Sequence, residues 1–184
     1  MSNNNANITD GQQTRAYAGY YGLWIGLCWI ASFALTVRGL QSPFLSDLGF
    51  LLGFASLVLG IKLVSGFAKN VAPLPLGRAW RLAWLMYGAA ALLCTAAQYI
   101  YFKYIDGGLL VRSYQELLEQ PQMQDLIKKA MGPEGMTMVQ DALNLFAATP
   151  PTQIALQWLL LNIILATIFA FPTALFSYTR KLNN

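Results

Sequence analysis

Few residues in this sequence have the types and spacing that enzymatic chemistry requires. The 184 residues include no histidine, the commonest general base and the commonest metal ligand. The two cysteines, Cys28 and Cys94, lie apart within apolar stretches, where free cysteine packs as a small hydrophobic side chain. One carboxylate pair, Glu116 and Glu119, falls on a helical pattern that otherwise indicates a solvated surface. We therefore expect a protein that is not an enzyme and that binds neither a cofactor nor a metal.

Four polar residues are candidates for a site inside a membrane: Arg38, Asp47, Gln98 and Asn162. Asp47 lies one turn into an expected helix, where a negative charge complements the helix dipole, and Arg38 lies a short loop before it. The favoured interpretation is an Arg38–Asp47 ion pair that closes this turn. Gln98 and Asn162 would lie in the same half of the bilayer as Asp47. They predict either a structural hydrogen-bond cluster or the lining of a cavity open to the outside, and their spacing fits both.

Four long apolar stretches must position these residues. They are Tyr17–Val37, Phe44–Phe67, Arg81–Phe102 and Ile154–Tyr178. An apolar helix of about 20 residues crosses the hydrocarbon core of a bilayer, and each stretch is long enough to do so. Charged residues make up 11% of the chain, whereas roughly 25% is usual in soluble domains. The sequence therefore predicts an all-α membrane protein built as a four-helix transmembrane bundle.

The apolar pattern divides the chain into four segments. They are a polar N-terminal tail (1–16), transmembrane spans one to three (17–105), an extracytoplasmic helical segment (106–152), and the fourth span with a basic C-terminal tail (153–184). Lys and Arg near the span ends favour the side of both termini by seven to five, and such residues mark the cytoplasmic side. Both termini are therefore expected to be cytoplasmic. The net charge of +4 reflects this topology, and we expect no nucleic-acid partner.

Small residues recur along the first two spans and predict close helix packing. The candidates are Gly22 and Gly26 in the first span, and Gly49, Gly53 and Gly60 in the second. Glycine lets helix backbones approach closely where lipid supplies no hydrophobic force between helices. These stripes could pack the first two spans on each other. They could instead meet the spans of another membrane protein, or of a second copy of this chain.

The segment outside the membrane is predicted to form two or three short amphipathic helices. Apolar residues follow helical spacing on either side of Pro121, and Gly132-Pro133 ends the second helix. Methionine-rich faces suit adaptable contact surfaces. The candidate contact residues are Met123, Met131, Met138 and Phe146. These helices could lie on the membrane or cover the bundle, or they could form a docking face for a partner outside the cytoplasmic membrane.

The layout of the chain also carries a resemblance to a known family. Three closely spaced spans are followed by a helical segment that begins near Tyr104-Ile105-Asp106, and a Gly-rich break lies at Met131-Gly132-Pro133-Glu134-Gly135. A closing span then ends in Arg180-Lys181. In this layout the chain resembles domain of unknown function 4199, an uncharacterised family of small bacterial four-span inner-membrane proteins. The resemblance implies a four-span fold in a bacterial cytoplasmic membrane, and it implies no activity and no catalytic residue.

Together these patterns favour a non-enzymatic accessory or scaffolding subunit of a membrane complex. Its partners would be the lipid bilayer and another membrane protein or a second copy of the chain. The glycine stripes and the methionine-bearing helices would then make the contacts. The alternative is a small transporter, or a lipid-binding membrane protein, that uses Asp47, Gln98 and Asn162 as an outward-facing polar site.

Overall fold

The computed structural model describes residues 10–40, 42–71 and 73–179. The first part of the predicted N-terminal tail and the basic pair Arg180-Lys181 lie outside these residues. The described chain forms seven α-helices and one π-helical turn, η1. In chain order they are α1 (Asp10–Arg38), α2 (Pro43–Val71), α3 (Leu76–Ile100), η1 (Tyr101–Ile105), α4 (Leu109–Glu119), α5 (Pro121–Met131), α6 (Gly135–Ala148) and α7 (Pro151–Ser177).

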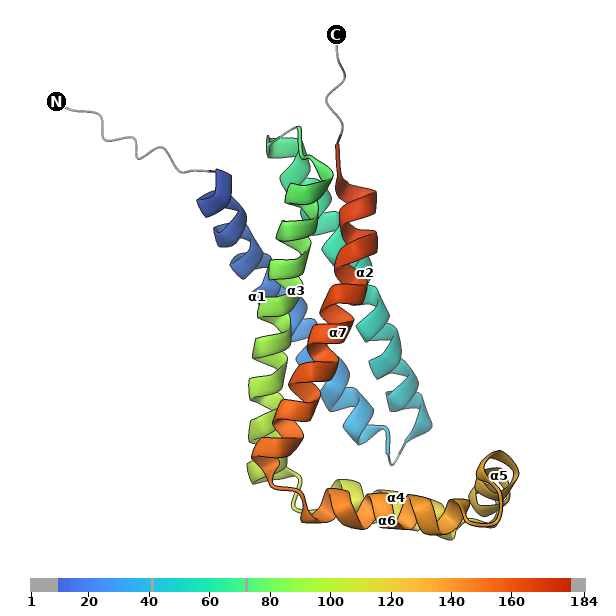
Figure 1. Cartoon of the computed structure of the whole chain (residues 1–184). Coiled ribbons are helices and arrows are strands. Elements are labelled where there is room, and N and C mark those ends of the chain that lie inside the picture. Colours follow the sequence, from blue (N-terminus) through green and yellow to red (C-terminus); the bar gives the residue numbers. More distant parts are fainter. Residues whose placement is uncertain (1–9, 41, 72, 180–184) are drawn as a thin grey trace, which may run out of the picture.

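Four long helices form a bundle, with three short helices across one end (Figure 1). The long helices are α1, α2, α3 with its continuation η1, and α7; each is 27 to 30 residues long and apolar enough to cross a membrane. At 1.5 Å per residue such helices exceed the hydrocarbon thickness of about 30 Å. The predicted all-α, four-span bundle is confirmed. The protein is a multi-pass membrane protein.

The two ends of the bundle are formed by different segments of the chain. The terminal end holds the start of α1, the α2–α3 loop and the end of α7, and the cap end holds the α1–α2 turn and the short helices (Figure 1). At the terminal end α1 begins at Asp10, which lies inside the tail predicted for residues 1–16. Arg78 of α3 contacts this first turn, where its guanidinium bonds Thr14 and pairs with Asp10.

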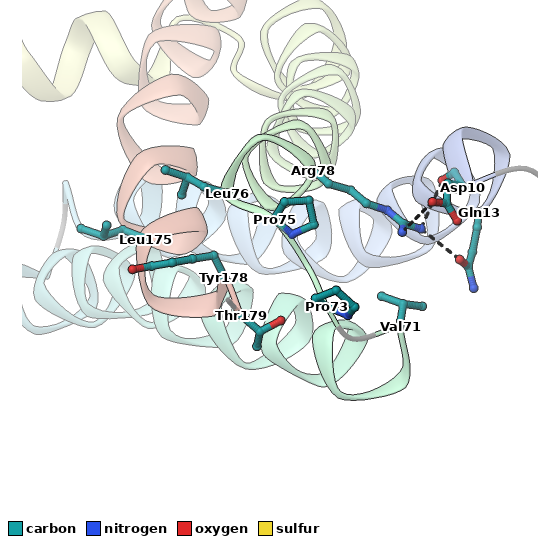
Figure 2. A pocket seen from close by; sticks show the side chains of 10 residues that line it. All are labelled: Asp10, Gln13, Val71, Pro73, Pro75, Leu76, Arg78, Leu175, Tyr178 and Thr179. Carbon is teal, nitrogen blue, oxygen red and sulfur yellow. Dashed lines mark hydrogen bonds and ion pairs between the residues drawn. The ribbon is translucent and has the colours of Figure 1, made fainter. Parts of the chain in front are cut away.

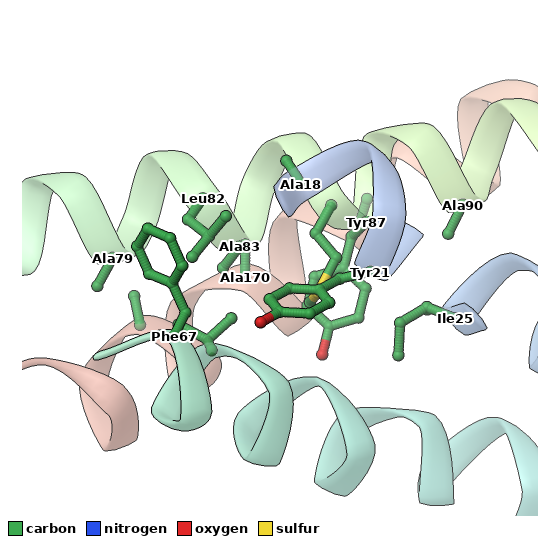
Figure 3. Close-up of a cluster of buried hydrophobic side chains, with 14 of the residues drawn as sticks. Ala18, Tyr21, Ile25, Phe67, Ala79, Leu82, Ala83, Tyr87, Ala90 and Ala170 are labelled. Carbon is green, nitrogen blue, oxygen red and sulfur yellow. The ribbon is translucent and has the colours of Figure 1, made fainter. Parts of the chain in front are cut away.

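Helix α3 lies at the centre of the bundle. It packs along both α1 and α7, whereas α2 packs mainly on α1 and touches α7 to a smaller extent. Small side chains line α3 where its neighbours approach, and the fully buried ones are Ala79, Ala83, Ala90 and Ala91. Larger side chains fill the spaces between helices, among them Ile25, Phe67, Leu82 and Tyr87 (Figure 3). The outer faces of α2 and α7 expose Phe50, Phe54, Leu160 and Phe176, as expected for helices that contact lipid.

The glycines pack helices of this chain against one another. A Cβ on Gly22 would lie 2.7 Å from the Met86 carbonyl oxygen, and one on Gly26 would lie 3.3 Å from Cα of Ala90, so both glycines face α3. The first two spans do pack on each other, as one of the two alternatives had it, but the glycines of the first span face α3 and not α2.

The second glycine stripe divides between two helices. A Cβ on Gly49 would lie 2.9 Å from the Ser32 carbonyl oxygen, and one on Gly53 would lie 3.3 Å from the Ser32 hydroxyl, so these two face α1. Gly60 lies against the Tyr87 hydroxyl of α3. Because these glycines meet helices of their own chain, they are not free to receive the spans of a partner.

Candidate functional site

Two of the four predicted polar residues meet between α3 and α7. The Asn162 side-chain amide donates to Gln98 Oε1 at 3.1 Å and to Thr95 Oγ1 at 3.1 Å. Gln98 and Asn162 are both buried. Within the described parts of the chain, every buried side-chain nitrogen and oxygen has a hydrogen-bond partner. The cluster is therefore closed on itself, and it joins two helices as interhelical hydrogen bonds do in lipid.

Replacing Asn162 with leucine is expected to destabilise the protein moderately. The change removes both interhelical hydrogen bonds and leaves the buried Gln98 carbonyl without its donor. Hydrogen bonds between membrane helices contribute about 0.6–1.7 kcal/mol, so we expect a loss of about 1–2 kcal/mol in unfolding free energy. The measurement is thermal unfolding of the purified full chain in a mild detergent. An unfolding midpoint equal to that of the wild type would show that the cluster does not hold α3 to α7.

Arg38 and Asp47 do not join this cluster, and the predicted Arg38–Asp47 ion pair is not formed. Both side chains are exposed, and the ion pair found among residues 10–40, 42–71 and 73–179 is that of Arg78 with Asp10. Gly49 faces α1, and a residue two positions away lies about 200° around the helix. Asp47 therefore points away from α1 and from Arg38. The turn is closed by backbone contact between Gly39 and Ser46, which leaves no room for a larger side chain at Gly39.

The three short helices form a hairpin that we call the cap, residues 109–148. Helices α4 and α6 lie side by side and crosswise to the long helices, and α5 joins their far ends (Figure 1). Proline starts α5 at Pro121, where its missing N–H is not needed, and Gly132 ends it with a positive φ of 79°. The prediction of short amphipathic helices is confirmed, and there are three of them.

The cap is fastened to the bundle at one end of the hairpin. Asp106 follows η1, and its carboxylate accepts hydrogen bonds from the Tyr101 hydroxyl at 3.0 Å and from the Gly108 amide at 3.0 Å. The Phe146 ring packs edge-on against Phe102 with centroids 6.2 Å apart. Phe146, a predicted contact residue for a partner, is therefore used inside the chain. A cavity of about 440 Å³ lies beside this connection.

The rest of the cap exposes large apolar side chains. Met131 and Met138 are exposed as predicted, whereas Met123 is half-buried. Two leucines that the sequence analysis did not single out, Leu126 and Leu145, are 59% and 71% exposed. Leu145 lies seven positions after Met138 and shares its helix face, so helical spacing could have identified Leu145. Leu126 is five positions from Met131 on α5 and lies on another face, so that spacing does not identify it.

Sequence reasoning also missed the polar contacts at the terminal end, where Arg78 is the central residue. The Arg78 side chain is 17% exposed, and its three nitrogens contact α1 (Figure 2). Nε donates a hydrogen bond to Thr14 Oγ1 at 3.2 Å, and Nη2 donates one to Gln13 Oε1 at 3.1 Å. Nη1 lies 3.2 Å from an Asp10 carboxylate oxygen. The guanidinium carbon also lies 5.6 Å from the centre of the Phe67 ring, a cation–π distance. In the sequence Arg78 contributes only to the charge count that sets orientation. Its partners come from a helix more than sixty positions away, and spacing along the chain does not reveal them.

Comparison with known protein families identifies the family of this chain. A family model described as a protein of unknown function (DUF4199) matches residues 20–178. The chain belongs to this family. The match runs from within α1 to the end of α7 and so includes the cap as well as the bundle, which confirms the resemblance drawn from the layout. No curated protein and no solved structure matches the chain.

The family description names no activity, so chemistry must be judged from the geometry of this member. Among the residues that the structure describes, no three His, Cys, Asp or Glu side chains gather as metal ligands would. The polar residues inside the bundle bond one another, and the exposed apolar residues outside it gather on the cap. The cap is therefore the part of the described chain best suited to external contact.

Proposed function

We propose that this protein is a non-enzymatic accessory or scaffolding subunit of a membrane complex. It would lie in the cytoplasmic membrane of a bacterium, with both termini in the cytoplasm and the cap outside. The orientation is supported by the Lys and Arg excess on the side of the termini. The single observation that carries the proposal is the exposed apolar surface of the cap, formed by Leu126, Met131, Met138 and Leu145.

The spacing of these cap residues favours a protein partner over the bilayer surface. Leu126 and Met131 are five positions apart on α5, so their side chains point about 140° away from each other. A flat lipid surface could cover only one of them. Met138 and Leu145 are seven positions apart on α6 and share one face, which extends the contact surface beyond α5. A partner that wraps around the free end of the hairpin and extends along α6 toward the bundle would bury all four.

The bundle itself supports the scaffold proposal over the transport alternative. A transport site built from Asp47, Gln98 and Asn162 would need these residues to face one cavity. Gln98 and Asn162 bond each other between α3 and α7, and Asp47 lies on the exposed side of α2. The glycine stripes, which could have met a partner's spans, pack within the chain. We therefore assign the partner contact to the cap.

The proposal is tested by the recovery of a membrane partner that depends on the cap. The tagged full chain is solubilised from native membranes in a mild detergent, and the proteins recovered with it are quantified by mass spectrometry. We expect a stoichiometric partner, and we expect Met131→Glu and Met138→Glu each to reduce its recovery at least about tenfold, because a charge would be buried in the contact. Thr137→Glu is the matched control, since Thr137 is exposed beside Met138 and carries no apolar contact surface. Equal recovery from all the variants would contradict the proposal.

A further inference from the structure

A large cavity lies at the terminal end of the bundle. Its volume is about 1210 Å³; it opens to the surface and is lined by residues from the start of α1, the α2–α3 loop and the end of α7. Figure 2 shows Arg78, Asp10 and Gln13 at one end of the lining and Leu76 and Leu175 at the other. The cavity is therefore charged at one end and apolar at the other, which is the polarity of an amphipathic ligand.

At the charged end, the Arg78 guanidinium is held in place by neighbouring side chains, and the Asp10 carboxylate beside it is exposed. The Arg78 guanidinium is held by Thr14 and Gln13, and its side chain is 17% exposed. The Asp10 side chain is 84% exposed although one carboxylate oxygen lies 3.2 Å from Arg78. Nε of Arg78 bonds Thr14, and Nη2 bonds Gln13 and the Asp10 carbonyl oxygen at 3.4 Å, so these contacts hold the guanidinium in place. Nη1, which faces the Asp10 carboxylate, is the nitrogen that a phosphate oxygen can reach when that carboxylate turns away. Asp10 can turn from Arg78 toward a positive group on the same ligand.

At its apolar end, the cavity adjoins a groove on the lipid-facing side of the bundle. This second space, of about 330 Å³, is lined by Leu76, Gly77, Trp80, Phe171, Ala174 and Leu175. Leu76 and Leu175 line both spaces, so the two are adjacent. The groove runs between the first turns of α3 and the last turns of α7, where an acyl chain would enter the bilayer. The lining contains no charged side chain.

We propose that this cavity and groove bind one membrane phospholipid whose headgroup carries both a phosphate and a primary ammonium, as phosphatidylethanolamine does. The phosphate binds Arg78, the ammonium binds Asp10, and an acyl chain lies in the groove along Trp80. The pair of opposite charges sets this choice of headgroup. A headgroup with negative charge alone would leave Asp10 facing a like charge, and a quaternary ammonium would have no N–H to donate to the carboxylate.

The proposal is tested by lipid binding to the purified full chain. Phosphatidylethanolamine, phosphatidylcholine and phosphatidylglycerol with identical acyl chains are added to the protein in detergent, and bound lipids are counted by native mass spectrometry. We expect phosphatidylethanolamine to bind about tenfold more tightly than either of the others, because a charged hydrogen bond is lost in each exchange. Equal affinities for the three lipids, or tighter binding of phosphatidylglycerol, would overturn the proposal.

Two pairs of variants locate the site. Arg78→Gln should abolish the preference, whereas Arg81→Gln, at an exposed arginine one turn along α3, should keep it. Because Arg78 also holds α1, a second variant leaves these contacts intact. A Cβ on Gly77 would meet no atom within 4 Å, and Gly77 lines the groove, so we expect the ring of Gly77→Phe to occupy the groove. Its control is Gly88→Phe, at another open position on α3 outside the groove. A lipid preference that survives Gly77→Phe would refute binding in the groove, and this result is independent of any partner at the cap.

Discussion

Gly22→Val is expected to destabilise the bundle by about 3 kcal/mol, near the upper end of the usual cost of overpacking. A Cβ at this position would lie 2.7 Å from the Met86 carbonyl oxygen and 2.7 Å from Cβ of Ala89. The carbonyl oxygen belongs to the backbone of α3, so the clash is relieved only if α1 and α3 move apart. We expect a lower midpoint of thermal unfolding in mild detergent and a larger fraction of aggregate in size-exclusion chromatography.

Gly19→Val is the matched control for this substitution. Gly19 lies on the same helix less than one turn away, and a Cβ there would meet no atom within 4 Å. Both variants carry the same change in helix propensity, so the difference between them isolates the contact between α1 and α3. If Gly22→Val folded as stably as Gly19→Val but lost a partner protein, the glycine stripe would serve assembly, and the packing described above would be wrong.

Tyr87→Ala, at the centre of the bundle, is expected to destabilise the protein about as much as Gly22→Val. Tyr87 is fully buried; its ring stacks on Trp29 with centroids 6.1 Å apart, and its hydroxyl lies 3.0 Å from Thr173 Oγ1. Truncation of a large aromatic side chain in a core costs about 3–5 kcal/mol. In a membrane the lower end of this range applies, because lipid is as apolar as the core and the lost packing contacts alone set the cost. We therefore expect a loss of about 3 kcal/mol in unfolding free energy.

Tyr87→Phe separates the ring from the hydroxyl in this experiment. It keeps the stacking on Trp29 and removes the hydrogen bond to Thr173, so it should cost about 1 kcal/mol. Thermal unfolding followed by tryptophan fluorescence is suitable for both variants, because Trp29 is buried against the substituted ring. Equal stabilities of Tyr87→Ala and Tyr87→Phe would show that the hydroxyl, and not the packing of the ring, holds this part of the bundle together.

The helices of this protein are specified by the local sequence. Each apolar stretch is long enough to cross a bilayer, and length and composition are properties of the local sequence that need no tertiary contact. The division of the cap into three helices follows from Pro121 and Gly132, whose backbone preferences act locally. The Gln98–Asn162 contact was one of two outcomes that the sequence allowed, because a buried amide in lipid must find a partner.

The choice of which helix faces which depends on packing between distant parts of the chain. Helical spacing places Gly22 and Gly26 on one face of α1, but in lipid that face is equally apolar whether a second span, a third span or a partner covers it. The choice of α3 follows from the Ala-rich surface that α3 offers to these glycines. Asp47 and Arg38 are close in sequence, yet the rotation of α2 that brings Gly49 to α1 turns Asp47 away from Arg38. Arg78 and Asp10 are far apart in sequence, and only the packing of α1 beside α3 brings them to one cavity.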